Sequence, residues 1–127
     1  MNKEIFLTIL ILSLIIILDI VLSKNIDNKI DFISSKLEHL QENMDLEDEE
    51  NIKKEFEFID SEWKKTEEIF SFYLEHDELE KVGVEMSNIK ESIETGEFNE
   101  TKTDINRLQF ILEHLKDKMD FKLKNVF

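Results

Sequence analysis

The sequence predicts an all-α fold, in which an N-terminal transmembrane helix continues into a four-helix antiparallel bundle built from two helical hairpins. The chain has no proline, only two glycines and 36% charged residues, a composition typical of long helices. An unbroken apolar run occupies residues 5–22, and beyond it apolar residues recur at spacings of three and four, the period of a buried helix face. The turn clusters that short strands need are missing, so a sheet is not expected.

The apolar run at residues 5–22 is predicted to be a transmembrane anchor that contacts the lipid bilayer, preceded by a short tail at residues 1–4. As a helix it is roughly 27 Å long, enough to cross a thin hydrocarbon core. Asp19 is its one ionisable residue, either reaching the headgroups or making a polar contact inside the membrane. The end of the run also resembles a signal-peptide cleavage site at Ser23, but the run is long for a signal peptide, so a retained anchor is favoured.

The side of the membrane is harder to predict, because lysines flank the anchor on both sides. Long domains after an anchor translocate largely regardless of charge, so we expect the N-terminus in the cytoplasm and the helical domain outside the cell membrane. No helix breaker separates Leu22 from Ile26. The anchor and the first bundle helix are therefore expected to form one continuous rod through Met44.

The domain at residues 23–127 contains four apolar stripes, which predict helices at about 24–44, 48–75, 78–94 and 98–116, followed by a C-terminal tail. Short connections between them make neighbouring helices antiparallel. The stripes are Ile26, Ile30, Ile33, Leu37, Leu40 and Met44; Ile52, Phe56, Ile59, Trp63, Thr66, Phe70 and Tyr73; Leu79, Val82, Met86, Ile89 and Ile93; and Phe98, Thr101, Ile105, Leu108, Leu112 and Leu115.

Two connections carry local signals. The acidic run at residues 45–50 is expected to open the second bundle helix, since carboxylates are favoured in a first turn. It lacks the glycine of a calcium-binding loop, and Phe56 stands where the bidentate glutamate would be. Gly96 is expected to close the third helix in a left-handed conformation.

All three histidines, His39, His76 and His114, follow a Leu-Glu pair. We interpret His76 as the end of the second bundle helix, and Asp77 with Glu80 as a capping pair that opens the third. A helical carboxylate–histidine metal site needs ligands three or four residues apart, whereas Glu75 and His76 are adjacent. The sequence therefore predicts no metal, no cofactor and no catalytic residue.

Composition excludes several function classes. The formal net charge of −14 disfavours binding to nucleic acid, which needs clustered lysine and arginine. The absence of cysteine excludes thiolate catalysis, disulfides and cysteine-ligated zinc. No serine–histidine–acid order or phosphate-binding loop is present, so the protein is not expected to be an enzyme.

Trp63, His76 followed by Asp77, and the closing Asn125 and Phe127 occur in an order that resembles the domain of unknown function 4363 (DUF4363) family, over essentially the whole chain. The departures are mild, such as Phe70 where a second tryptophan is usual. The resemblance implies a small, acidic, membrane-anchored helical protein of Firmicutes with no established activity. It also implies a partner of the YetF type, a multi-pass membrane protein.

Two functional hypotheses follow. In the leading one, the protein is a non-enzymatic interaction or scaffold module for another membrane or envelope protein. In the alternative, a ligand-, metal- or pH-responsive sensor or enzyme site is centred on His76, with Asp77, Glu78 and His114 near it. Six apolar residues lie off the stripes and are candidates for a contact patch or a wider core: Phe58, Phe72, Leu74, Phe121, Val126 and Phe127.

Overall fold

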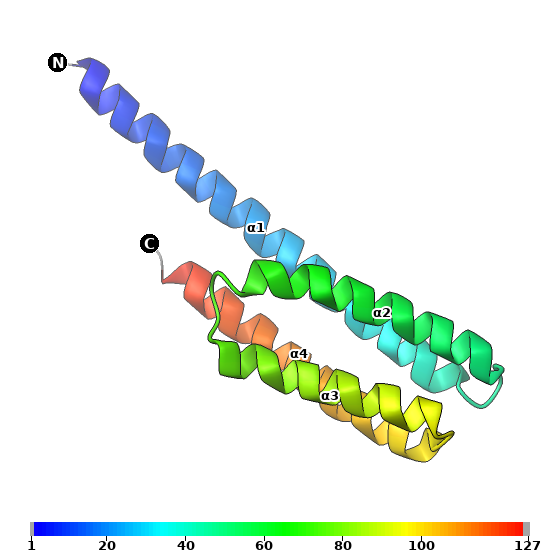
Figure 1. Ribbon diagram of the computed structural model, residues 1–127. Helices are drawn as coiled ribbons and strands as arrows, with labels where there is room; N and C mark the ends of the chain where they lie inside the picture. Colours follow the sequence, from blue (N-terminus) through cyan, green and yellow to red (C-terminus); the bar gives the residue numbers. More distant parts are fainter. Residues whose placement is uncertain (1, 126–127) are drawn as a thin grey trace.

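The computed structural model describes residues 2–125, except for the side chain of Leu123, and within them it contains four helices and no strand. These are α1 (Asn2–Asn43), α2 (Glu49–Phe70), α3 (His76–Glu94) and α4 (Phe98–Lys124) (Figure 1). The all-α prediction is confirmed. The chain folds up and down, and each helix packs against two neighbours: α1 and α3 both contact α2 and α4.

The N-terminal part of α1 projects far beyond the bundle (Figure 1). The α2–α3 connection and the C-terminal end of α4 lie at the end of the bundle from which α1 projects, while the α1–α2 and α3–α4 connections lie at the opposite end. We call these the anchor end and the far end. The continuous rod predicted from the missing breaker is confirmed, because α1 runs without interruption from Asn2 to Asn43.

The core consists of the predicted stripes. Every stripe residue is buried except Tyr73 and Phe98, which are partly buried and pack against the core. Two further apolar residues are buried that the stripes did not include, Leu74 and Met119. A helix that turns one apolar stripe inward gains most of its stability from this packing rather than from intrinsic propensity.

Local signals at two helix ends are confirmed. Asp48 precedes α2 and its carboxylate accepts a hydrogen bond of 2.8 Å from the Asn51 amide, which satisfies an otherwise unpaired donor of the first turn. Gly96 has φ 75°, and the amides of Gly96 and Glu97 donate to the carbonyls of Ile93 and Ser92, which closes α3.

The predicted capping around His76 is wrong. α2 ends at Phe70, and His76 is the first residue of α3 rather than the last of α2. Glu75 occupies the cap position without a side-chain hydrogen bond, and Asp77 lies inside the first turn. The earlier break is electrostatically favourable, because it places the acidic residues at the positive end of α3 instead of the negative end of α2.

The predicted end of the last helix near residue 116 is also wrong, since α4 continues to Lys124. Met119 extends the buried stripe by one more turn, and Lys122 and Lys124 suit the negative end of the helix dipole. Of the residues off the stripes, Phe58, Phe72 and Phe121 are exposed whereas Leu74 belongs to the core. Val126 and Phe127 lie outside the described residues.

Candidate functional site

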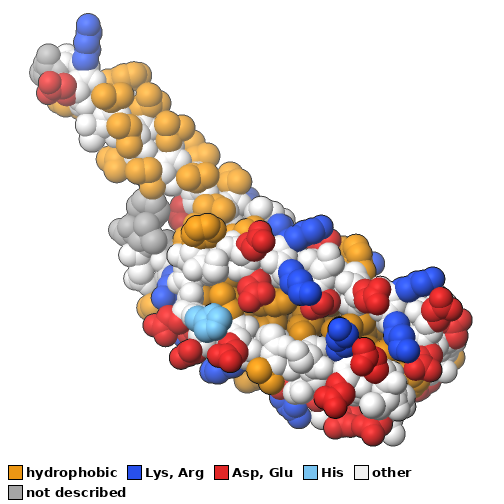
Figure 2. Space-filling view, viewed as in Figure 1, with side chains coloured by type: hydrophobic (Ala, Val, Ile, Leu, Met, Phe, Trp, Pro, Cys, Tyr) orange, Lys and Arg blue, Asp and Glu red, His pale blue; other side chains and the backbone are white. Residues whose placement is uncertain are grey.

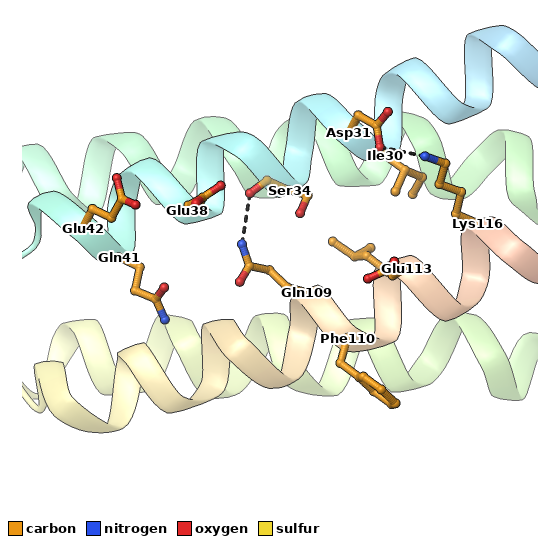
Figure 3. Close-up of a pocket in the computed structure, with 11 residues that line it drawn as sticks. Ile30, Asp31, Ser34, Glu38, Gln41, Glu42, Gln109, Phe110, Glu113 and Lys116 are labelled. Atoms are coloured by element: carbon orange, nitrogen blue, oxygen red, sulfur yellow. Dashed lines mark hydrogen bonds and ion pairs between the residues drawn. The ribbon is translucent and has the colours of Figure 1, made fainter.

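An open groove of about 580 Å³ lies between α1 and α4 (Figure 3). Ile30 and Leu112, both buried, lie beneath it. Gln109 crosses the groove and donates a hydrogen bond of 3.2 Å to the carbonyl oxygen of Ser34, as Figure 3 shows. The groove therefore follows the α1–α4 packing line and is bridged by polar contacts instead of being closed by apolar ones.

Acidic side chains dominate the edges of this groove. Asp31, Glu38, Glu42 and Glu113 line it, against a single basic residue, Lys116. Lys116 Nζ lies 2.9 Å from Asp31 Oδ1, and this contact raises the pKa of the lysine. The structure gives no Lys or Arg partner to the other three carboxylates among its described residues. The groove thus presents net negative charge to an approaching molecule.

Phe110 extends this surface on the α4 side. Its side chain is 75% exposed and points away from α1 (Figure 3). An exposed aromatic residue beside a polar groove is a frequent anchor point in protein–protein contacts. The sequence analysis did not single out Phe110, although its place between the buried stripe residues Leu108 and Leu112 indicates the outer face of the helix.

The anchor end carries two exposed aromatic residues, Phe72 in the α2–α3 connection and Phe121 near the end of α4, which are 85% and 68% exposed. Lys122 and Lys124 lie in the same last turn of α4. The Ser23 hydroxyl lies 3.4 Å from Asp120 Oδ1, which places this turn beside the start of the projecting part of α1. Figure 2 shows the projecting part covered by apolar side chains and the bundle covered by mixed charges.

A pair of carboxylates lies where α1 leaves the bundle. Burial, followed by the nearby charge of Asp120, raises the pKa of Asp27, while Lys116 opposes the shift. One carboxylate oxygen of Asp27 is buried and has no hydrogen-bond partner. Folding therefore makes ionisation of Asp27 less favourable than it is in the unfolded chain.

The single arginine ties α3 to α4. Arg107 Nη1 lies 3.3 Å from Glu85 Oε2 and 3.2 Å from Asp104 Oδ1, and both carboxylates are buried. Burial and the charge of Glu85 raise the pKa of Asp104, and Arg107 opposes this rise. These residues interrupt no stripe, so the sequence pattern gave no signal of their contact. The ion pairs with Arg107 explain why Glu85 and Asp104 are buried: they hold α3 against α4.

The residues predicted from the family resemblance are not gathered into one site. Trp63 is buried in the core, with its ring 6.0 Å from that of Phe70. His76 and Asp77 are exposed at the start of α3. The Asn125 side chain donates to the Phe121 carbonyl at 2.7 Å and finishes α4, while Phe127 lies outside the described residues. Trp63 and Asn125 thus have structural contacts, and His76 and Asp77 are open to solvent.

The structure does not support a shared metal site around His76 and His114 among the residues that it describes. No group of three histidine or acidic donors within metal-binding distance includes His76 or His114 in the part of the chain that the structure describes. Glu78, next to Asp77, forms an ion pair with Lys118 of α4.

Asp19 is partly shielded, unlike the residues before it in α1, and it lies seven residues before Ile26, on the face that α1 turns to the bundle.

Comparison with protein families gives one match. The family model described as a domain of unknown function (DUF4363) matches residues 20–126. The matched region begins at Ile20, so it includes the whole bundle and leaves out most of the apolar segment. No curated protein and no solved structure matches the chain.

Proposed function

This chain belongs to the DUF4363 family, whose description names no activity, and we propose that it is a single-pass membrane protein whose helical bundle binds another membrane or envelope protein without catalysing a reaction. Residues 5–22 cross the bilayer in this proposal, and the bundle stands on its outer surface. The partner contacts the acidic groove between α1 and α4 together with Phe110.

The observation that carries the proposal is the division of α1. It is the one helix in the described part of the chain that is long and apolar enough to cross a membrane, and none of its most apolar stretch is buried. The same helix then supplies five core residues from Ile26 to Leu40. An exposed apolar surface of this size is costly in water and favourable in lipid, so a bilayer is the environment that suits it.

The anchor end supports a bundle that rests on the bilayer. With residues 5–22 in the membrane, Phe72 and Phe121 come close to the headgroup region, where aromatic side chains are favoured, and Lys122 and Lys124 meet the lipid phosphates. If the apolar segment were a cleaved leader, these aromatic and basic residues would have no bilayer to contact. The retained anchor therefore explains more of the surface.

The groove supports a partner with basic and apolar groups. Its unpaired acids attract lysine or arginine, and Phe110 offers the apolar contact that gives such a complex its affinity. The alternative site centred on His76 lacks comparable support, because no donor set forms around that residue in the described part of the chain.

Photo-crosslinking in the native membrane tests the proposal. A photoreactive amino acid replaces Phe110 in one variant and Lys64, which is exposed on α2, in a matched control. We expect a discrete crosslinked product from position 110, containing a second membrane or envelope protein, and no such product from position 64. Recovery of the bare monomer from both positions would refute the binding role.

Membrane topology is tested separately, and the absence of native cysteine makes the experiment clean. Lys64→Cys is treated with a membrane-impermeant maleimide in intact cells. We expect labelling without lysis if the bundle lies outside. Labelling that requires lysis would place the bundle in the cytoplasm and would leave the crosslinking result to be interpreted on that side.

A further inference from the structure

Three side chains from three consecutive segments meet toward the far end of the bundle. His39 comes from α1, Glu47 from the α1–α2 connection and Glu55 from α2. Each offers a donor atom, and these atoms all lie within 4.8 Å of one another. His39 Nδ1 is 3.9 Å from Glu55 Oε2. This group is independent of the groove and of the membrane segment.

The two carboxylates of this group face each other without a basic residue between them. One oxygen of Glu47 is buried and has no hydrogen-bond partner. Lys54, on the same stretch of α2, pairs with Glu50 instead. Two carboxylates in contact repel each other unless a proton or a cation lies between them.

We propose that His39, Glu47 and Glu55 bind a Zn²⁺ ion. One imidazole nitrogen and two carboxylate oxygens are donors that zinc accepts, and three protein ligands leave a fourth position for water. Bonds of about 2.0–2.2 Å place tetrahedral ligands roughly 3.3 Å apart. The present spacings need a contraction that these partly exposed side chains make by rotation, because none of the three is packed in the core.

The ion joins the first hairpin at its turn. Since the ligands come from both helices and from the connection between them, binding restrains the turn and stabilises the pairing of α1 with α2. Protons compete with a metal ion for imidazole and carboxylate ligands, so affinity falls as the pH is lowered. The metal thus acts on the part of the protein most distant from the projecting segment.

Calorimetric titration with ZnCl₂ tests the site, using the full chain in detergent micelles and metal-free buffer. We expect saturable binding of one ion per chain. His39→Gln and Glu55→Gln are each expected to weaken binding at least tenfold. His114→Gln is the matched control, because His114 is also an exposed helical histidine beside a glutamate but belongs to no group of three donors within metal-binding distance in the described part of the chain. It is expected to bind as the wild type does.

Two further measurements keep the result unambiguous. Circular dichroism establishes that each variant keeps its helical content, so that lost binding is not lost folding. Zn²⁺ is expected to raise the melting temperature of the wild type and of His114→Gln, and to leave that of Glu47→Gln unchanged. Absence of saturable binding, or binding that His39→Gln leaves intact, would overturn the proposal.

Discussion

The two halves of α1 have the same backbone and opposite surfaces. Residues 5–18 are exposed all round and apolar except for Thr8 and Ser13, whereas the half from Ile26 onward buries one stripe and presents charge elsewhere. Helical conformation alone does not distinguish them. The first half satisfies its backbone internally and presents apolar side chains in every direction, which suits lipid, while the second turns one stripe to other helices and the rest to water. The distribution of apolar residues around the axis therefore decides which solvent each half needs.

The largest expected effect comes from making the first half polar. Leu12→Arg combined with Ile16→Arg places two cations in the middle of the apolar segment, each opposing insertion by about 2.5–3.5 kcal/mol. We expect the double variant to be extracted from membranes by alkaline carbonate. The bundle should still fold, because neither residue contacts it, and Leu12→Ala with Ile16→Ala should remain membrane-bound. Unchanged membrane retention of the arginine variant would show that this segment is not the anchor.

The complementary change leaves the membrane segment intact and opens the second half. Leu37 is fully buried, and Leu37→Ala is expected to lower the free energy of unfolding by about 2–5 kcal/mol through lost burial and a residual cavity. Chemical denaturation in detergent measures it. Leu46 is 83% exposed, so Leu46→Ala should change the stability by no more than about 0.5 kcal/mol. Equal effects at the two positions would contradict the assignment of the core.

The third prediction concerns the junction between the two halves of α1. Asn25 is exposed in the middle of α1, and Asn25→Pro removes a backbone donor there and kinks the helix, at a cost of about 3 kcal/mol. We expect spin labels at positions 12 and 35, both exposed on α1, to show a shorter and broader distance distribution in the proline variant. Asn25→Ala is the control. A wild-type distribution that is already broad would contradict the rigid rod.

The smallest expected effect concerns pH at the same junction. Because the pKa of Asp27 is raised in the folded protein, its ionised form costs stability above the unfolded pKa, and that cost disappears as the pH falls through the folded pKa. Asp27→Asn should therefore raise the melting temperature at pH 7 and change it little near pH 4. The gain should stay below about 1 kcal/mol, because Asp27 is only partly buried.

Replacing Asp31 is expected to shift the melting temperature in the direction opposite to that of Asp27→Asn. Its carboxylate pairs with Lys116, so Asp31→Asn is expected to lower the melting temperature at pH 7. Two aspartates one helical turn apart would then differ in sign for an electrostatic reason. Identical shifts for Asp27→Asn and Asp31→Asn would show that the contact between Asp27 and Asp120 does not govern the pH response.

Periodic features of the fold are predictable from the sequence and local ones are less so. The spacing of the apolar residues predicts the burial of Leu37, Trp63 and Ile89, since a period near 3.6 determines which face of a helix turns inward. The break at Phe70 is not periodic. It depends on the turn that brings Leu74 into the core and on the charges of the acids that follow. A helix that ended anywhere between Phe70 and His76 would keep the same apolar stripes, so the stripes do not determine the break.

The candidate sites depend on contacts between segments, which a single sequence does not display. His39, Glu47 and Glu55 are eight residues apart at each step, and eight residues along one helix would not bring ligands together. The turn at residues 44–48 changes that by reversing the chain. The α1–α4 groove likewise joins residues about seventy positions apart, so its acidic edges become one surface only after folding.

If residues 5–22 cross the bilayer as proposed, the unbroken course of α1 also couples the rotation of this segment about its axis to the orientation of the bundle. With no swivel between the two halves, rotating the bundle about the membrane normal turns Asp19 through the same angle. Asp19 shares its face with Ile26, on the side where the bundle stands, so a neighbouring transmembrane helix that seeks this carboxylate must come from beneath the bundle. In such an arrangement, the orientation of the folded domain would determine the direction in which Asp19 faces within the membrane.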